Sequence, residues 1–299
     1  EVKAMNIVYT GAVAFSRHCL EEIIASGAVV CGIMQPIKSK TASDYADCKD
    51  LAEQHGIPYH VFVGINDPET VSWVRCLKPD IMFVFGLSQL IRAELLKLPT
   101  MGVVGCHPAK LPANRGRHPI IWSLFLGLDQ SALTFFFMDE GADSGPILCQ
   151  RMFPIAATDT AADVKLKLRH LATEMIREFL PMLMKGELVT MPQNASKASS
   201  WRKRSRKDGV IDWRMSGDAI LNLVRALTKP YPGAETAVHG TKIIIWKASC
   251  WKGAVKACDE PGKIIAIDDG KPVVKCYDSA IVIEQSDPVL PCKKGEYIL

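Results

Sequence analysis

Three polar loops interrupt the largely apolar sequence between Gly102 and Leu148. They read Gly105-Cys-His-Pro-Ala-Lys-Leu-Pro112, Asn114-Arg-Gly-Arg-His-Pro119 and Met138-Asp-Glu-Gly-Ala-Asp-Ser-Gly-Pro146. Residues 105 and 107 of a strand point to the same face, so we expect His107 to face a site and Cys106 to point elsewhere. A carboxylate such as Asp143 beside His107 would orient the imidazole for acid–base chemistry on an amine or an oxyanion. The alternative is a structural histidine at a strand end.

A further turn, Thr10 to Ser16, joins the first apolar segment to a helical pattern, a place where a phosphate could bind. The turn has one glycine where a dinucleotide fingerprint has three, and it lacks the Gly-Lys-Ser/Thr of a P-loop. We therefore favour a plain strand-to-helix turn over a nucleotide site.

The apolar segments around these loops alternate between strand and helix patterns, which is typical of an open parallel sheet. Strands are predicted at 6–9, 29–34, 59–63, 80–85, 102–107 and 132–137. Helices are predicted at 16–26, 44–55, 68–78, 93–98, 119–126 and 163–184. In such sheets the carboxyl ends of the strands border the ligand crevice, where the polar loops begin. The pattern indicates the α/β class, with a Rossmann-like, mostly parallel sheet.

Beyond this region the periodicity changes. Residues 190–208 are rich in Ser, Pro, Gln and basic side chains, which indicates a linker or a domain boundary. After a helix at 216–227, β-like segments follow at 242–247, 263–267, 272–276 and 280–284, separated by Gly, Pro and Asp turns. We predict a catalytic domain over residues 1–200 and a smaller β-barrel-like (OB-like) domain over residues 208–299.

Composition limits the classes of protein to which the chain can belong. Its 299 residues suggest about two domains, and 48% apolar with 23% charged residues is ordinary for a globular protein. The net charge of +4 does not indicate a dedicated nucleic-acid-binding protein. The ten cysteines form no CxxC pair and no cluster with histidine, which predicts buried thiols and no metal site. We expect a protein of the reducing cytoplasm, because neither a signal-peptide pattern nor a run of about 18 apolar residues is present.

The polar loops carry motifs that resemble a known enzyme family. His107-Pro-x-x-Leu-Pro112, Arg115-Gly116, Pro119, Trp122 and Asp139-x-Gly-x-Asp143-x-Gly-x-Ile147 occur in this order. Asp208-Gly-Val-Ile-Asp-Trp213, Asn222-Leu-Val-Arg-Ala226 and Pro230-Tyr-Pro-Gly-Ala234 follow. This combination resembles the formyltransferases that use 10-formyltetrahydrofolate, which include the methionyl-tRNA enzymes and the amino-sugar enzymes. The resemblance implies transfer of a formyl group from the folate N10 to an amine through a tetrahedral intermediate.

The resemblance also implies catalytic roles. His107 matches the histidine that donates a hydrogen bond or a proton to the developing oxyanion, and Asp143 matches the carboxylate that positions this histidine and helps to take the amine proton. Gly105 departs from the pattern, because the family has an asparagine there that polarises the formyl carbonyl. Asn114 or His118, an ordered water, or weak activity would each account for the difference. We expect an active enzyme and name Asn114 as a candidate catalytic residue, with loop shaping as its equal alternative.

A binding site for 10-formyltetrahydrofolate, the formyl donor, follows from the same resemblance. The residues expected around this cofactor are Gln89, Leu90, Ile91, Arg117, Asp139, Glu140, Gly141 and Ala142. Peptide groups of irregular loops suit a pterin, which presents donors and acceptors in one plane. The alternative for Gln89 is a residue that starts a helix.

Two groups within the family differ in the amine that receives the formyl group. For a nucleotide-linked amino sugar, Lys110 and Arg115 could meet phosphate or sugar oxygens. Trp201 and Tyr231 could stack on a base or a sugar, unless they serve core packing. The loops resemble most the bacterial sugar N-formyltransferases of pseudaminic-acid-type pathways, which implies a UDP-linked 4-amino-4,6-dideoxy sugar and a place in surface polysaccharide biosynthesis.

A methionyl-tRNA acceptor is the alternative, with Arg202 to Lys207 as the strongly basic run that would bind it. From Asp208 to Leu299, however, 12 Lys and Arg are balanced by 12 Asp and Glu, so the second domain is net neutral and the sugar is favoured. A 10-formyltetrahydrofolate hydrolase and a non-catalytic binder are further alternatives. We expect folate and a nucleotide sugar as partners, no nucleic acid or membrane, and a homodimer as one possible assembly.

Overall fold

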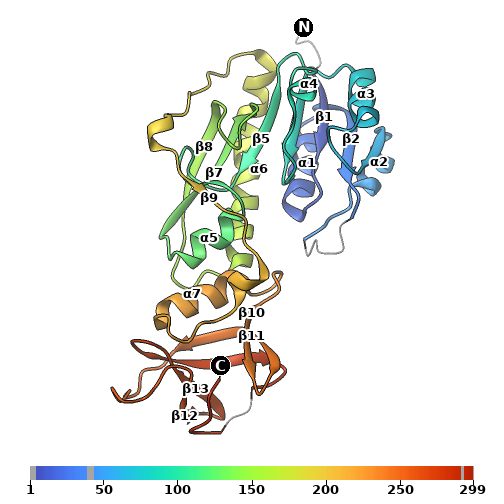
Figure 1. Cartoon of the computed structure of the whole chain (residues 1–299). Helices are drawn as coiled ribbons and strands as arrows, with labels where there is room; N and C mark the ends of the chain where they lie inside the picture. The colour runs from blue at the N-terminus through green and yellow to red at the C-terminus, as the bar shows by residue number, and fades with distance from the viewer. Residues whose placement is uncertain (1–4, 39–43, 291–292, 299) are drawn as a thin grey trace. The chain divides into compact units, whose positions relative to one another are not determined.

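The computed structural model describes residues 5–38, 44–290 and 293–298, and the chain divides into two compact units (Figure 1). The first unit contains the described residues up to Pro119, together with Gln130–Phe153 and Lys165–Trp201. The second unit contains Ile120–Asp129, Pro154–Val164 and the described residues from Arg202 onward. Two short segments within the expected catalytic domain, 120–129 and 154–164, therefore group with the C-terminal part.

A seven-stranded sheet in the order β3-β2-β1-β4-β5-β7-β8 forms the centre of the first unit. Its strands are β1 (Asn6–Thr10), β2 (Val29–Pro36), β3 (Tyr59–Phe62), β4 (Ile81–Phe85), β5 (Val103–His107), β7 (Gln130–Phe137) and β8 (Ile147–Pro154). The pairs from β3 to β5 are parallel, whereas β5 and β7 are antiparallel. The predicted α/β class with a mostly parallel sheet is confirmed.

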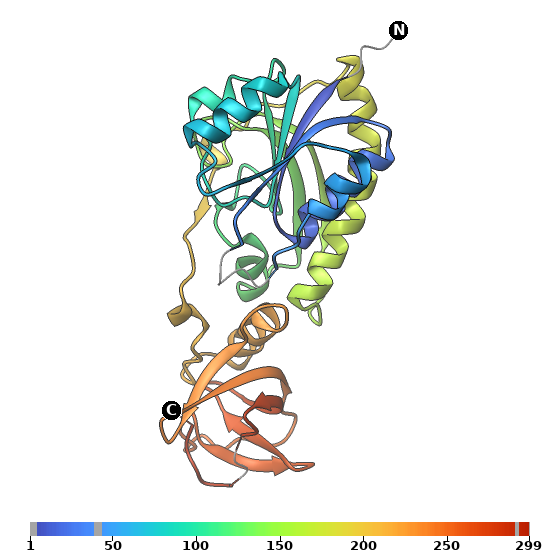
Figure 2. The same ribbon diagram turned by 90° about the vertical axis from the view of Figure 1, so that its right-hand side faces the viewer.

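Helices cover both faces of this sheet (Figure 2). They are α1 (Ala14–Ala25), α2 (Lys49–His55), α3 (Pro68–Leu77), α4 (Ala93–Leu96) and α6 (Ala161–Lys185). On one face the Phe179 ring of α6 lies 6.4 Å from that of Phe83 and 5.0 Å from that of Phe135, between centroids. On the other face Val71 and Val74 of α3 join a buried apolar cluster with the strands. Strands with apolar side chains on both faces supply both contacts, as expected for a parallel sheet.

The strand order reverses between β1 and β4. The chain passes from β1 through β2 to β3 on one side, and from β4 to β5 on the other. Ligands of open α/β sheets bind at such a switch point, outside the carboxyl ends of the strands. In this unit those ends lead into the turn after Thr10 and the loop after Phe85, and β5 ends with His107.

Two local predictions for the first unit are wrong. The helix expected at 44–55 begins only at Lys49, because Ala46 instead donates a backbone hydrogen bond to Ala12 in the turn after β1. The prediction also lacks β8, in which the polar Gln150 and Arg151 interrupt the apolar run. Both differences arise from long-range contacts that local periodicity does not report.

The nine cysteines within the described residues are free thiols, and their burial differs. Cys19, Cys48 and Cys276 are buried, Cys31, Cys106 and Cys149 are partly exposed, and Cys76, Cys250 and Cys258 are exposed. The prediction of buried thiols is thus wrong for the last three, and Cys292 lies outside the described residues. Burial raises the pKa of the Cys149 thiol to about 12.

The second unit contains a five-stranded antiparallel sheet in the order β10-β11-β14-β13-β12. Its strands are β10 (Ala234–Val238), β11 (Thr241–Cys250), β12 (Ile264–Asp268), β13 (Lys271–Lys275) and β14 (Ala280–Asp287), of which β10 was not expected. The unit also holds α7 (Gly217–Leu227), whose N-terminus is capped by the Ser216 side chain, and all of α5 (Pro119–Phe125) except its first residue. The predicted β-rich second domain is confirmed. Among the described helices of both units, none is both long and apolar enough to cross a membrane.

Arg225 joins separate segments of the second unit. Its guanidinium donates to the backbone carbonyls of Asp159 at 2.9 Å, Ala156 at 3.2 Å and Leu124 at 3.4 Å. The Nε atom donates to Oδ1 of Asn222 at 2.8 Å. Partial burial lowers the pKa of Arg225. This arrangement explains why the Asn222-to-Ala226 motif contains an arginine: it joins α7 to carbonyls of two other segments, of which Ala156 and Leu124 also accept backbone hydrogen bonds from Asp159 and Gly127.

We expect Arg225→Met to lower the free energy of unfolding by about 1–3 kcal/mol, because three carbonyls would lose a charged donor. Arg214→Met is the control, since Arg214 is exposed and pairs with Asp212 two residues away, an interaction worth at most about 1 kcal/mol. Urea unfolding of both variants would measure the difference. Equal effects would show that the Arg225 contacts contribute no more than a surface ion pair.

Candidate active site

His107 and Asp143 lie together, as predicted. His107 ends β5 with only 6% of its side chain exposed, and Asp143 reaches it from the loop between β7 and β8. The Nδ1 atom of His107 is 3.5 Å from Oδ2 of Asp143, an ion-pair distance. The loops at the ends of two sheet strands therefore bring a titratable base next to a carboxylate.

The second ring nitrogen of His107 also faces an oxygen. Its Nε2 lies 2.8 Å from the main-chain carbonyl oxygen of Asn114. A carbonyl oxygen only accepts hydrogen bonds, so Nε2 carries the hydrogen in this contact. The remaining nitrogen, Nδ1, is then the atom at which the ring takes up or releases a proton, on the side of Asp143.

Gly116 holds the same carboxylate from another direction. Its N–H donates to Oδ2 of Asp143 at 2.8 Å. Gly116 belongs to the two-residue strand β6 (Arg115–Gly116), which pairs in parallel with β9 (Ser200–Trp201). With a φ of +98° and a Cβ position 2.4 Å from the carbonyl oxygen of Trp201, this position accepts only glycine. The Arg115-Gly116 motif thus helps to hold the carboxylate of Asp143 in place.

The loop that carries Asp143 is shaped by Asp139. Its Oδ1 accepts hydrogen bonds from the N–H of Gly141 at 3.0 Å and from the hydroxyl of Ser144 at 2.6 Å. The side chain of Asp139 therefore serves the turn, which leaves the exposed backbone of Glu140, Gly141 and Ala142 as the predicted cofactor contact.

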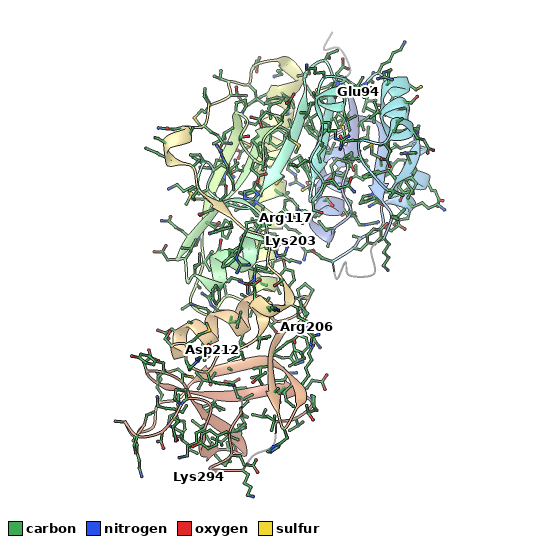
Figure 3. The ribbon with its side chains drawn as sticks, in the orientation of Figure 1. Glu94, Arg117, Lys203, Arg206, Asp212 and Lys294 are labelled. Carbon is green, nitrogen blue, oxygen red and sulfur yellow. The ribbon has the colours of Figure 1, made fainter. Side chains whose placement is uncertain are left out.

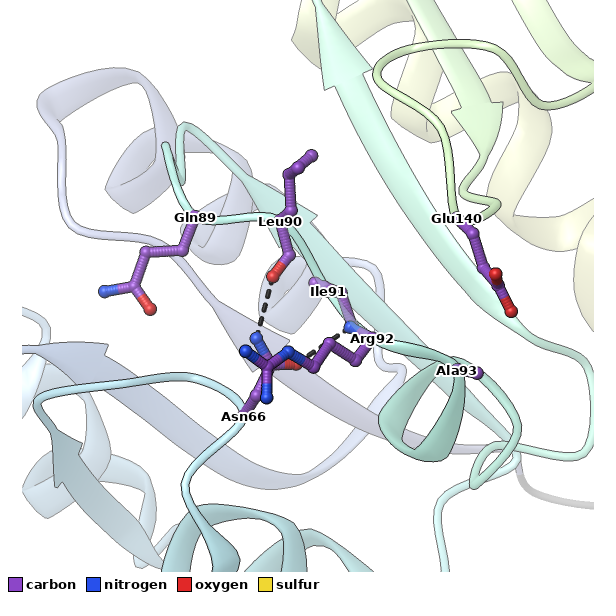
Figure 4. Close-up of a pocket in the computed structure, with 7 residues that line it drawn as sticks. All are labelled: Asn66, Gln89, Leu90, Ile91, Arg92, Ala93 and Glu140. Atoms are coloured by element: carbon purple, nitrogen blue, oxygen red, sulfur yellow. Dashed lines mark hydrogen bonds between the residues drawn. The ribbon is translucent and has the colours of Figure 1, made fainter.

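A cavity of about 540 Å³ lies between this loop and the loop after β4 (Figure 4). Its lining residues are Asn66, Gln89, Leu90, Ile91, Arg92, Ala93 and Glu140. The structure therefore brings together four of the residues predicted around the folate. Its mixture of apolar side chains, exposed peptide groups and charged ends is of the kind that binds a flat heterocycle with a polar tail.

Asn66 and Arg92 were not predicted for this cavity. Asn66 donates from Nδ2 to the carbonyl oxygen of Leu90 and accepts from the N–H of Arg92, both at 2.8 Å. It thereby fixes the conformation of the segment that lines the cavity (Figure 4). For Asn66, distance in sequence explains the omission, because no local spacing links it to Leu90; Arg92 directly follows the predicted Ile91.

Gln89 uses its side chain within the protein. Its Oε1 accepts from the N–H of Ile65 at 2.8 Å, and its Nε2 donates to the carbonyl oxygen of Val63 at 2.9 Å. Both ends of the amide are therefore engaged with the loop after β3. A contact from Gln89 to a ligand would come from its main chain or from a rearranged side chain.

A second cavity, of about 360 Å³, lies at the switch point between β1 and β4. It is lined by Ala12, Val13, Pro36, Ile37, Tyr45, Val63, Gly86, Leu87, Ser88 and Gln89. In the turn after β1, the N–H of Val13 donates to the hydroxyl of Ser16 at 2.9 Å. An internal acceptor therefore occupies this amide, which agrees with a plain strand-to-helix turn.

Gly105 lies beneath the site in tight surroundings. A Cβ atom at this position would be 2.9 Å from Cζ of Phe136 and 3.0 Å from Cγ of Met138. Phe136 belongs to a small buried cluster with Leu111 and Ile147. The space that the asparagine of the family would need is therefore filled from β7 and its following residue.

Asn114 contacts His107 through its main chain. Its side-chain Oδ1 instead lies 3.4 Å from the hydroxyl of Ser199, which also accepts from the N–H of Asn114 at 2.9 Å. With a φ of +63°, Asn114 adopts a left-handed conformation that asparagine tolerates better than most residues. These contacts agree with the loop-shaping alternative for its side chain.

Arg117, predicted for the cofactor, and the residues predicted for the substrate are distributed over several segments. Arg117 donates to the carbonyl oxygen of Ser88 at 3.0 Å and so joins the loop after β4 (Figure 3). Arg115 donates to Oε1 of Gln193, whereas Lys110 is exposed on the loop after His107. Trp201 lies in β9, and its carbonyl oxygen accepts from the N–H of Arg117.

Tyr231 belongs to the second unit, between α7 and β10, where its N–H donates to Thr228. Its role toward a substrate remains a prediction. No group of three or more His, Cys, Asp or Glu able to hold a metal ion occurs among the described residues.

Comparison with known families gives two adjacent matches along the chain. Residues 23–180 match a family model described as formyl transferase, and residues 203–289 match that of the formyl transferase C-terminal domain. A methionyl-tRNA formyltransferase from Ruminiclostridium cellulolyticum is 32% identical over 302 residues, which cover 98% of this chain and 96% of the relative.

Solved structures with the same fold share less sequence. An N-formyltransferase from Helicobacter canadensis, in complex with folinic acid and dTDP-3-aminofucose, aligns over 93% of this chain and 98% of its own at 17% identity, with a TM-score of 0.71. The sugar 3N-formyltransferase WlaRD, in the presence of dTDP and 5-N-formyl-THF, aligns over 96% and 99% at 18% identity, with a TM-score of 0.69. HypX from Aquifex aeolicus, in complex with tetrahydrofolic acid, gives a TM-score of 0.68 at 19% identity, and the alignment covers 95% of this chain but only 44% of HypX.

The surroundings of Gly105 predict that a side chain there is costly. We expect Gly105→Ala to destabilise the protein by about 1–3 kcal/mol through overpacking against Phe136, and Gly105→Asn to do so without raising kcat. In combination with Phe136→Leu, Gly105→Ala should cost less than it does alone, as measured by denaturant unfolding. A Gly105→Asn protein as stable as the wild type and faster in formyl transfer would contradict this account.

Proposed function

Because this chain belongs to the formyltransferase family, we propose that it transfers the formyl group of 10-formyltetrahydrofolate to the amine of a nucleotide-linked amino sugar. The observation that carries the proposal is the buried His107 beside Asp143, at the carboxyl end of β5. Membership of the family supports the class of reaction.

The chemistry requires a proton to leave the acceptor and an oxyanion to be stabilised. The folate supplies the formyl carbon, which the acceptor nitrogen attacks to give a tetrahedral intermediate, and the bond from that carbon to N10 then breaks. Asp143 and Nδ1 of His107 form the pair that accepts the proton from the amine, and the proton passes on to N10 of the departing folate. The N–H at Nε2 of His107 is held by the carbonyl oxygen of Asn114, so it serves the oxyanion when that bond is exchanged for one to the substrate. A donor aimed at charge that develops in the transition state commonly contributes about 3–4 kcal/mol. Burial of His107 strengthens such a contact, since little water competes with it.

The donor is proposed to bind in the cavity lined by Leu90, Ile91 and Glu140, three residues before Asp143. The folate compounds present in the three related structures support this donor. Arg92, at the edge of the cavity, offers a cation to the carboxylates of the folate tail (Figure 4).

The charge of the chain after the basic run favours a small acceptor over an RNA. The region from Asp208 to Leu299 is net neutral, as its 12 Lys and Arg balance its 12 Asp and Glu. A protein that binds RNA uses several cations that are free to contact phosphates.

The basic run Arg202–Lys207 is largely engaged within the second unit. Arg202 pairs with Asp208, and Arg206 pairs with Glu235 at 2.9 Å (Figure 3). Arg204 is buried, with its guanidinium 4.7 Å from the Trp122 ring centroid and 5.1 Å from that of Phe125.

These contacts change the interpretation of the run. The Arg202 guanidinium holds the pKa of Asp208 well below its usual range, and burial lowers the pKa of Arg204. The three arginines of the run thus make contacts within the second unit, whereas the side chains of Lys203 and Lys207 are exposed.

A second candidate is methionyl-tRNA formyl transfer, favoured by the relative that is 32% identical over 98% of the chain. The sugar is preferred here because of the net-neutral region from Asp208 to Leu299 and the engaged arginines. Two related structures, one with dTDP and one with dTDP-3-aminofucose, support a nucleotide-linked acceptor. Within that class a UDP-linked 4-amino-4,6-dideoxyhexose is the first acceptor to test.

Removal of either member of the pair should abolish most of the turnover. We expect His107→Asn and Asp143→Asn to lower kcat by about 10²- to 10⁴-fold, with folate binding retained, because only the transition state uses the pair. His55→Asn, at the exposed end of α2, is the matched control. Steady-state kinetics and titration with 5-formyltetrahydrofolate would measure both effects, and wild-type turnover by the His107 variant would exclude it from the chemistry.

The acceptor is tested by direct competition. With a fixed concentration of donor, we expect a higher kcat/KM for UDP-4-amino or dTDP-3-amino sugars than for methionyl-tRNA, and a weak dependence on salt, because a diphosphate offers few charges. A faster reaction with methionyl-tRNA would establish the second candidate. Donor consumption without any acceptor would indicate a hydrolase, and donor binding without turnover a non-catalytic binder.

A further inference from the structure

Gln193 joins the two loops that hold the catalytic pair. Its Nε2 donates to the carbonyl oxygens of Asp143 at 2.9 Å and Gly145 at 2.7 Å. Its Oε1 accepts from Nη2 of Arg115 at 2.7 Å and from Nε at 3.2 Å. One amide thus makes four hydrogen bonds, with two donated to the loop of Asp143 and two accepted from the loop of Gly116.

The segment that carries Gln193 is itself anchored on both sides. Met191 exchanges two backbone hydrogen bonds with Ile147, at 2.8 and 2.9 Å, just after the loop of Asp143. Further along, β9 pairs with β6. Between these anchors, Gln193 is half-buried while the other residues from Met191 to Lys197 are exposed. The segment therefore directs one side chain inward, at the junction of the loops.

Asp143 needs this support because of its backbone. Its φ is +54°, a left-handed conformation that costs a non-glycine residue roughly 1 kcal/mol or more. Such a conformation persists only where surrounding contacts determine it. The bond from Gln193 to the carbonyl oxygen of Asp143 is one such contact, and the bond from Gly116 to its carboxylate is another.

We propose that Gln193 is a positioning residue: it sets the carboxylate of Asp143 relative to His107 by joining the Asp143 loop to Arg115. This inference rests on the proposed function only in that the pair is catalytic. Without Gln193, the loop of Gly116 would lose its link to the main chain of Asp143 and would hold that residue through the bond from Gly116 to the carboxylate. The carboxylate could then move away from Nδ1 of His107. A displacement of about 1 Å at a catalytic group can lower turnover about 100-fold.

The test compares Gln193→Ala and Gln193→Glu with Asn194→Ala as control. Gln193→Glu keeps the partner of Arg115 but turns the donor toward two carbonyl oxygens into an acceptor, so both variants at 193 should lower kcat by about 10- to 100-fold with little change in KM. Asn194 lies next in the chain and uses its side chain only to cap a short turn, through the N–H and hydroxyl of Ser196. Asn194→Ala should therefore keep the wild-type kcat.

Two readouts separate positioning from a general loss of structure. In the Asp143→Asn background, Gln193→Ala should lower kcat little further, because residues that act through one another are not additive. The ring ¹⁵N resonance of His107, assigned among the seven histidines by its loss in His107→Asn, should shift in Gln193→Ala and not in Asn194→Ala.

The outcomes distinguish this inference from the proposed function. Additive effects of Gln193→Ala and Asp143→Asn, or an unchanged kcat and His107 resonance in Gln193→Ala, would overturn the positioning role while leaving the pair catalytic. If instead His107→Asn and Asp143→Asn retain turnover, the proposed function fails first. In that case a shifted His107 resonance in Gln193→Ala would still establish the structural link.

Discussion

A single carboxylate oxygen, Oδ2 of Asp143, connects the parts of this site. It accepts a hydrogen bond from the N–H of Gly116 and lies 3.5 Å from Nδ1 of His107. These three residues come from three separate segments: the end of β5, the short strand β6 and the loop before β8. Because the ring of His107 is buried, water cannot replace this oxygen as its partner when the carboxylate moves away. The surrounding loops must therefore be held firmly.

In the first unit, the sheet and then the segments outside it hold these loops. The sheet fixes the end of β5, and β7 pairs with it so that His107 lies opposite Thr134. Thr134 in turn donates to the carbonyl oxygen of Ala109 at 2.7 Å, which ties the loop after His107 to the same strand. The loops that carry Asp143 and Gly116 are joined instead by the 191–201 segment, which lies outside the sheet. Catalytic groups on loops reach useful precision only when such supporting contacts exist.

The sequence predicted the parts of this fold and site that depend on local pattern. Alternating apolar segments identified six strands of the first sheet, and the polar residues at their ends identified His107 and Asp143 as a pair. The sequence did not predict β8, whose Gln150 uses its side chain to bond Thr134 and Leu111 across the loop. That contact joins residues 16 and 39 positions apart, and no short-range spacing reports it.

Gln193 and Arg204 also make contacts that the sequence pattern did not predict. Both lie in a stretch whose composition indicates a solvated linker, and both direct a polar side chain into the protein. Composition describes the average residue of a segment, whereas one inward side chain such as Gln193 is enough to attach the segment to the protein. Composition therefore indicated a linker in this stretch and did not reveal the contacts that its side chains make.

The basic run shows why net charge alone is a weak guide to the acceptor. Counted from the sequence, Arg202 to Lys207 offers five cations to a polyanion. In the structure, an arginine that pairs with Asp208 or stacks on Trp122 must give up that contact to bind a phosphate. The affinity gained is then the difference between two interactions of similar strength, which reduces the electrostatic drive toward RNA. A diphosphate-linked sugar needs only a few free cations, so the proposed sugar acceptor does not depend on this run.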